Sequence, residues 1–329
     1  MAEIHRQLAL WGSEHLLQTA EAIADPRERQ LELHRIRYAS LAMGEIGDDD
    51  LYFCHSGLCQ TALPHKALAN NDAIWQRQSG RFHLMITPGA VRSASGKAER
   101  VGVPYGTRAR LIMIFLQSEG VKSRTVHLGS SMAAWIRSLG LVVSGGPRGT
   151  IQSIREQALR IARCEFTMQW SAASSDGENH TIIKDQRLVS GMSLWAAPDG
   201  GDEKWSATVE LAPDFHQHLR EHAVPLLKEA IAYLKDNSLA LDLYTLFAYR
   251  LQRLERPMLM RWAMLGQQTG SDVSRSSHLA QRVKAVLPDV LTVYPDAEVE
   301  LTRSGLKLFP SKPPVPKTLV QGFRLVNPR

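Results

Sequence analysis

Residues 145–170 read GGPRGTIQSIREQALRIARCEFTMQW and contain the clearest structural pattern of the chain. A turn rich in glycine precedes residues 150–163, whose apolar side chains recur at the spacing of an amphipathic helix. These side chains are Ile151, Ile154, Ala158, Ile161 and Ala162. Residues 164–171 then alternate between apolar and polar side chains, which is typical of a half-buried strand. The sequence therefore predicts a helix followed directly by a strand.

Two further helices are predicted before this stretch, with a short strand between them. The first covers 107–121. Its apolar run Leu111–Leu116 could by itself be a buried strand, but Thr107 as a possible N-cap and the lack of early turn residues favour a helix. The short strand covers 125–128. The second, 130–139, is amphipathic, and Gly140 is placed to end it. Upstream of these helices, residues 90–106 are rich in Gly, Ser and Pro and are predicted to form a long loop.

A hairpin is predicted to complete this unit. After the strand at 164–171, a polar loop leads to a second extended run, Thr181–Trp195, which is expected to pair with it. Helix, short strand, helix, basic helix and hairpin, in this order, indicate a winged helix. In that arrangement a helix enters the major groove of DNA and the hairpin contacts the backbone.

The same order of elements recurs nearer the C-terminus. The predicted elements are a helix over 238–254, a strand over 258–261, helices over 262–268 and from residue 275, and a hairpin of 298–302 with 306–309. Pro288 lies inside the long helix and is expected to break it near residues 286–287, because proline lacks the amide that the helix needs.

The predicted fold class is α+β, with tandem winged-helix domains and a helical N-terminal extension. The predicted domains are an acidic helical extension (1–50), an N-terminal segment with a linker (51–106), a first winged helix (107–212), a second winged helix (213–316) and a C-terminal tail (317–329). Five aromatic residues are predicted to lie in the cores, with stacking on single-stranded DNA as the alternative. They are Trp135, Trp170, Trp195, Tyr244 and Phe247.

Charge is distributed unevenly along the 329 residues. The chain has 39 Lys+Arg and 33 Asp+Glu, a net charge of +6. Residues 77–170 hold 14 basic and 4 acidic residues, whereas residues 1–76 hold 6 and 11. Residues 171–212 hold 3 basic and 7 acidic residues, and residues 213–329 hold 16 basic and 11 acidic residues. A basic block of this size points to nucleic acid, with an ordinary solvated surface as the alternative.

Basic and polar side chains on the two candidate recognition helices are the predicted DNA contacts. In the first winged helix they are Arg148, Gln152, Ser153, Arg155, Arg160 and Arg163. In the second they are Arg275, Ser277, His278, Gln281, Arg282 and Lys284, with Arg303 and Lys307 flanking the tip of the last hairpin. Outward side chains are expected at base edges and flanking ones at phosphates. The glycines of 145–149 either cradle a phosphate at the helix N-terminus or form a plain loop.

Several long motifs occur in a fixed order along the chain. They are HSGLCQTALPH (55–65), NDAIWQRQSGRFHLMITPG (71–89), VPYGTRARLIMIFLQSEGV (103–121), LGSSMAAWIRSLGL (128–141), the stretch 145–170 and LALDLYTLFAYRLQRL (239–254). Together they resemble the RepA-type plasmid replication initiators and, more distantly, the TrfA-type initiators. The resemblance runs from about Leu51 to Pro316.

This resemblance implies a cytoplasmic protein that is not an enzyme and binds direct repeats of double-stranded DNA in a plasmid origin. Such initiators help to open the adjacent AT-rich duplex and to load the host replicative helicase together with host DnaA. The resemblance also implies tandem winged helices and a monomer–dimer equilibrium that controls plasmid copy number. A winged-helix transcriptional repressor is the first alternative, since it would use the same DNA-binding architecture.

A zinc metallopeptidase is the second alternative. His218, Glu221 and His222 match the H-x-x-E-H pattern, in which two histidines bind zinc and the glutamate activates water. We favour a solvated helix end, because Pro225 follows closely and no third ligand stands out. A second group of possible zinc ligands comprises Cys54, His55, Cys59 and His65. Because their spacing is not that of a strong zinc site, we interpret this segment as a packed loop. The sequence therefore predicts no metal and no cofactor.

Other classes of protein are disfavoured by the absence of their motifs. The chain has no G-x-x-x-x-G-K-[ST] motif, which argues against ATP hydrolysis. Its longest apolar run is Leu111–Leu116, too short to span a membrane. The N-terminus does not resemble a signal peptide, and three cysteines fit a reduced compartment. A cytoplasmic location without membrane association is the expectation.

Overall fold

The computed structural model describes residues 3–93, 95–173, 179–193, 207–271, 276–316 and 319. The chain divides into two compact units, neither of which is continuous in sequence. Unit 1 comprises Met1–Tyr52, Val224–Gly266 and Val273–Phe323, and unit 2 comprises Phe53–Ala223, Gln267–Asp272 and Arg324–Arg329. These units differ from the predicted domains. The predicted extension 1–50 lies in unit 1 with most of the predicted second winged helix (213–316), and the segment 51–106 lies almost entirely in unit 2 with the predicted first winged helix (107–212).

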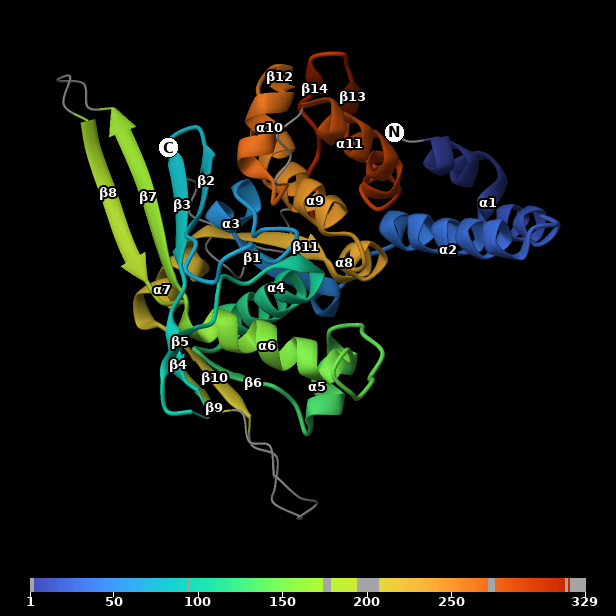
Figure 1. Cartoon of the computed structure of the whole chain (residues 1–329). Coiled ribbons are helices and arrows are strands. Elements are labelled where there is room, and N and C mark those ends of the chain that lie inside the picture. Colours follow the sequence, from blue (N-terminus) through green and yellow to red (C-terminus); the bar gives the residue numbers. More distant parts are fainter. Residues whose placement is uncertain are drawn as a thin grey trace. The chain divides into compact units, whose positions relative to one another are not determined.

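Unit 2 contains most of the strands, and the chain enters it within β1 (Figure 1). Its elements are β1 (Leu51–His55), α3 (Ser56–Gln60), β2 (Trp75–Ser79), β3 (Phe82–Thr87), β4 (Ala90–Arg92), β5 (Ala98–Arg100), α4 (Gly106–Lys122), β6 (Thr125–His127), α5 (Met132–Ser138), α6 (Thr150–Arg163), β7 (Glu165–Ala173), β8 (Asn179–Gln186), β9 (Val189–Ser193), β10 (Thr208–Leu211) and α7 (Pro213–His222).

The three predicted helices of this unit are present as α4, α5 and α6. The N-cap of α4 is Tyr105, and the predicted cap Thr107 lies inside the first turn. At α5, the Ser131 hydroxyl oxygen accepts a hydrogen bond from the Ala134 amide at 3.0 Å, as a helix N-cap does. Gly140 follows α5 with φ 71°, a conformation that glycine adopts without strain. Both α4 and α5 pack against α6.

The predicted hairpin after α6 is only partly right. Strand β8 pairs with β7, and both belong to a four-stranded sheet in the order β2-β3-β7-β8. The run Thr181–Trp195 does not continue as one strand. Strand β8, which pairs with β7, ends at Gln186, and the chain then forms the separate strand β9. Leu188 and Val189 are both buried, and consecutive residues of a straight strand point to opposite faces, so the run bends here. Trp195 lies outside the described residues.

A second sheet of unit 2 is formed by short strands from distant parts of the sequence. Strand β9 pairs with β10, which in turn pairs with β6, so the order is β6-β10-β9. The predicted loop 90–106 also contains regular structure. Its first half is an antiparallel hairpin of β4 and β5, with Ala90 opposite Arg100.

Unit 1 is built mainly from helices. Its elements are α1 (Glu3–Glu21), α2 (Pro26–Met43), the short 3-10 helix η1 (Asp48–Asp50), β11 (Ala223–Leu227), α8 (Lys228–Leu234), α9 (Ser238–Arg250), η2 (Leu251–Arg253), β12 (Met258–Arg261), α10 (Trp262–Gln268), α11 (Ser276–Thr292), β13 (Val299–Leu301) and β14 (Gly305–Leu308). The first residue of β11 and the last two of α10 fall in unit 2.

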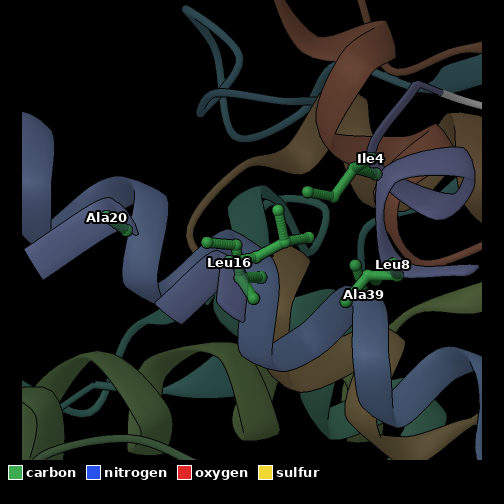
Figure 2. Packing of buried hydrophobic residues seen from close by; sticks show 6 residues of the cluster. Ile4, Leu8, Leu16, Ala20 and Ala39 are labelled. Carbon is green, nitrogen blue, oxygen red and sulfur yellow. The ribbon is translucent and has the colours of Figure 1, made fainter. Parts of the chain in front are cut away.

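The N-terminal extension is helical, as predicted, and it forms a hairpin of α1 and α2 in which α1 is kinked at Gly12. Helices α1 and α2 pack along each other around buried Ile4, Leu8, Leu16 and Ala39 (Figure 2). The hairpin is not an isolated appendage, because buried His5 hydrogen-bonds through Nε2 to the Thr292 carbonyl at 2.9 Å. The extension therefore packs against the C-terminal end of α11.

The elements α9, β12, α10, α11, β13 and β14, here called the C-terminal motif, repeat the arrangement of α4, β6, α5, α6, β9 and β10, here called the first motif. The sheet of the C-terminal motif has the order β12-β14-β13, which corresponds strand for strand to β6-β10-β9. Helix α9 packs against α11, as α4 packs against α6. Each unit thus holds helix, strand, helix, helix and a pair of strands, with the last strand at the centre of its sheet.

The predicted break in the long helix is wrong. Helix α11 runs without interruption from Ser276 to Thr292, with Pro288 inside it. Proline at this position removes the hydrogen bond to the carbonyl of Lys284, one turn earlier. Pro288 and Lys284 are both exposed, so water can satisfy that carbonyl.

Candidate nucleic-acid interface

Helix α6 starts from a tight turn that the sequence 144–150 dictates. The Ser144 amide donates to the Thr150 hydroxyl at 2.8 Å, and the Thr150 amide donates to the Ser144 hydroxyl at 3.0 Å. Gly146 has φ 82°, which favours glycine. Gly149 is the N-cap, and a Cβ there would collide with the carbonyl oxygens of Ser144 and Gly145. The turn fixes where the helix begins and in which direction it points.

The buried face of α6 holds the helix against its neighbours. Ile154, Ala158 and Ile161 are fully buried, as the sequence predicts. Gln157 is also buried, and its Oε1 accepts a hydrogen bond from the Tyr105 amide at 2.9 Å. The opposite face is the one that α6 leaves exposed.

An exposed stripe runs along this opposite face. Gln152, Arg155, Leu159 and Arg163 are all exposed and recur at helical spacing, and Arg148 is exposed in the turn before them. Four of these five residues were predicted from the sequence. Leu159 was missed because an apolar residue in an amphipathic helix is expected on the buried side. Ser153 is half-buried, and its hydroxyl donates to the Thr150 carbonyl at 3.0 Å, so it supports the first turn.

Arg160 has a structural role that its sequence position does not reveal. Its guanidinium contacts the Glu156 carboxylate at 2.9 Å and donates to the Val103 carbonyl at 3.1 Å. It also lies 5.1 Å from the centre of the Tyr105 ring, and only 12% of the side chain is exposed. The prediction that Arg160 contacts DNA is not supported by this geometry, because its donors already bind within the protein.

Arg160→Ala and Arg163→Ala should therefore have different effects on the free energy of unfolding. We expect Arg160→Ala to lower the free energy of unfolding by about 1.5–3 kcal/mol, because hydrogen bonds from a mostly buried charged group are lost. The exposed Arg163 forms no such bonds within the described residues, so Arg163→Ala should change the free energy of unfolding by less than about 0.5 kcal/mol. Urea denaturation of both variants measures the difference. Equal losses of stability would contradict this assignment.

The second candidate helix, α11, presents its predicted polar face. Ser277, His278, Gln281, Arg282 and Lys284 are all exposed, whereas Leu279 and Val283 are buried. The remaining predicted residue of this helix, Arg275, lies outside the described residues.

The last hairpin carries two predicted contacts in different settings. Arg303 is exposed in the turn between β13 and β14. Lys307 lies within β14 opposite Leu259 and Glu300, with its Nζ 5.0 Å from the centre of the Phe309 ring. Arg303 is therefore at the tip as predicted, whereas Lys307 lies along the hairpin.

His218, from the metallopeptidase alternative, contacts His55, from the second candidate group. His55 Nε2 and His218 Nδ1 are 2.7 Å apart, and His55 Nδ1 accepts a hydrogen bond from the Gly57 amide. Cys54 and Cys59 are buried, and the Cys59 thiol lies 3.9 Å from the Cys54 carbonyl. Within the described residues, no group of three or more His, Cys, Asp or Glu is arranged to hold a metal ion.

The aromatic residues are placed largely as predicted. Trp135, Tyr244 and Phe247 are fully buried in the cores of their units. Trp170 is half-buried, with its ring 4.9 Å from Phe82 and 5.0 Å from His218.

Among the helices that the structure describes, none is both long and apolar enough to cross a bilayer.

Two similar motifs and their exposed helix faces characterise this protein. The chain is a mixed helix-and-sheet protein with two similar motifs, each of which exposes polar and basic side chains on one long helix. Residues 103–263 match the model of a family described as plasmid encoded RepA protein. This segment, nearly half of the chain, is therefore similar to that family of plasmid replication proteins, and the predicted resemblance is confirmed.

Two solved structures are similar to this chain in fold. Two crystal structures of domains 2 and 3 of RctB, one of them from selenomethionine derivatives, are similar to this chain at 14% sequence identity with a TM-score of 0.46. The matches cover 79% and 76% of this chain and 98% and 94% of the RctB chains. No curated protein matched the sequence.

Proposed function

We propose that this protein is a plasmid replication initiator that binds double-stranded DNA at its own origin and has no enzymatic activity. The observation that carries the proposal is the position of α6. The helix lies inside the family segment 103–263, and its exposed face bears Gln152, Arg155 and Arg163. Amide and guanidinium groups are the side chains that read base edges in the major groove.

We also propose that each motif is a winged helix. Three features support this assignment, namely the order of elements, the matching sheet orders and the packing of the first long helix against the last. In this arrangement the strand pairs β9–β10 and β13–β14 are the wings. The first wing is therefore not the hairpin that the sequence predicted, because β7 and β8 belong to another sheet.

The contacts divide into those that read bases and those that bind phosphates. On α6, we assign Gln152 and Arg155 to base edges, and Leu159 to an apolar contact with a thymine methyl group. Arg148 and Arg163 lie at the two ends of the helix and are assigned to phosphates.

The second motif follows the same division. On α11, Gln281 and Arg282 are assigned to base edges, and His278 and Lys284 to phosphates. Arg303, in the turn of the second wing, is assigned to the DNA backbone.

The proposal extends to partners that the resemblance implies. The chain would bind direct repeats, help to open the adjacent AT-rich duplex and act with host DnaA and the replicative helicase in the cytoplasm. A homodimer would compete with the DNA-binding monomer and so limit copy number. The paired motifs suit direct repeats, since two helices in one chain can read one asymmetric site.

A footprint of the full chain on the DNA that flanks its gene tests this function against the repressor alternative. We expect protection of several repeats in the same orientation beside an AT-rich tract. Protection of a single palindrome over the promoter would instead indicate a transcriptional repressor. Absence of any sequence-specific protection would contradict both functions.

A further inference from the structure

The hairpin β4–β5 stands at the C-terminal end of α6 (Figure 1). Its residues 90–100 are exposed or half-exposed wherever the structure describes them, and it contributes nothing to the buried core. Arg92, Lys97 and Arg100 give it three positive charges against one negative charge, that of Glu99. An exposed hairpin with this composition does not stabilise the fold by burial, so its side chains are available to a partner.

Both ends of the hairpin are fixed to the last turn of α6. Gly89, just before β4, lies so close to the Arg163 carbonyl that a Cβ would collide with it. After β5, the Gly102 carbonyl lies 3.3 Å from the Cys164 thiol, and the Val103 carbonyl accepts the hydrogen bond from Arg160. The two ends are joined to each other by the Val101 amide, which donates to the Gly89 carbonyl at 3.1 Å. The hairpin therefore has a fixed origin relative to α6.

Hydrogen bonds join the described residues on the two sides of the hairpin tip. The Ser93 amide donates to the Lys97 carbonyl at 2.8 Å, and the Gly96 amide donates to the Ser93 carbonyl at 2.8 Å. Gly96 has φ 81°, which allows the tight reversal. At about 3.3 Å per strand residue, the tip extends about 15–20 Å from the end of α6. The major groove is about 12 Å wide, so this reach is sufficient to meet the backbone beyond a groove-bound α6.

The three basic residues of the hairpin are not equivalent. Arg100 donates to the Pro88 carbonyl at 2.8 Å and lies 3.5 Å from the Asp72 carboxylate, so it is bound within the protein. In the described part of the chain, Arg92 and Lys97 form no ion pair, and both are exposed. Their charges complement the phosphates of DNA.

We infer that the β4–β5 hairpin is an additional DNA-binding element, in which Arg92 and Lys97 contact backbone phosphates next to the α6 site. This inference rests on the proposed function, because it places the hairpin beside a DNA duplex bound to α6. The hairpin lengthens the bound site without reading its sequence.

The double variant Arg92→Ala/Lys97→Ala tests this inference in the full chain. Binding to a footprinted origin repeat and to a scrambled duplex is measured by fluorescence anisotropy between 50 and 300 mM salt. We expect the slope of log K against log salt to fall by about 2, since each phosphate contact contributes about 0.9. At 0.15 M salt, affinity for both duplexes should fall by about 30-fold. The footprint should shorten at one end.

The matched control is Lys122→Ala/Arg220→Ala, which removes two exposed positive charges from α4 and α7 of the same unit. This control should leave the slope within about 0.5 of that of the unmodified chain. If the unmodified chain does not bind DNA, the proposed function fails. If that chain binds specifically and the hairpin variant behaves like the control, only the hairpin inference is overturned.

Discussion

Replacing Gln152 and Arg155 together by alanine is expected to lower the affinity for origin repeats by at least 30-fold. Both side chains are exposed one turn apart on α6, and each good bidentate contact with a base contributes about 1–3 kcal/mol of discrimination. Affinity for scrambled DNA should fall by less than about tenfold, because only one positive charge is lost. Fluorescence anisotropy with both duplexes measures the ratio between the two affinities.

A matched pair of residues provides the control. Gln217 and Arg220 have the same spacing on α7, and both are exposed in the same unit. Gln217→Ala/Arg220→Ala should leave the ratio of specific to nonspecific affinity unchanged within about threefold. If the α6 variant lost the same factor on both duplexes, α6 would supply charge and would not read sequence.

Gly149→Ala is expected to impair both folding and binding, with a loss of about 3 kcal/mol in the free energy of unfolding. The added Cβ would overlap the carbonyl oxygens of Ser144 and Gly145, which are backbone atoms that cannot rotate away. The turn must open to relieve the overlap, and the hydrogen bonds between Ser144 and Thr150 would then be strained. Because this turn sets the direction of α6, specific binding should fall by more than the loss of folded protein explains.

Gly145→Ala is the control within the same turn. A Cβ at Gly145 meets no atom within 4 Å, and its backbone is not in the left-handed region. Thermal unfolding should be unchanged within about 1–2 °C, and affinity for the repeat should be retained. Equal destabilisation by both substitutions would show that the turn is sensitive to any side chain, and that close packing at Gly149 is not the cause.

Local signals explain why so many elements were predictable. Helix α6 lies between a glycine-rich turn and an alternating strand, so its bounds Thr150–Arg163 follow from residues next to it. The same holds for β12 and α10, whose bounds Met258–Arg261 and Trp262–Gln268 agree with the prediction. Pattern, cap and stop residues all lie within a few positions of each element.

Long-range contacts explain what the sequence could not show. The partner of β9 is β10, and the third strand of that sheet, β6, lies more than 60 positions earlier in the chain. The structural role of Arg160 depends on the Val103 carbonyl, and the docking of the N-terminal extension depends on a contact between His5 and Thr292. No periodicity within a single segment encodes these pairings.

The candidate site was predictable to the extent that it lies on helix faces. Exposure of Gln152, Arg155 and Arg163 follows from the apolar stripe on the other side of α6. The β4–β5 hairpin was hidden, because its strands have three residues each and no alternation between apolar and polar side chains. Short strands of this kind are stabilised by the turn and by what their ends contact, which here is α6.

A transformation assay tests whether this chain starts plasmid replication through α6. The gene and its flanking DNA are placed on a selectable circle that has no other origin and introduced into a host of the plasmid. We expect stable transformants with the unmodified gene and with Gln217→Ala/Arg220→Ala, and none with Gln152→Ala/Arg155→Ala. Transformants with all three genes, or with none, would contradict the account that this chain starts replication by reading its origin through α6.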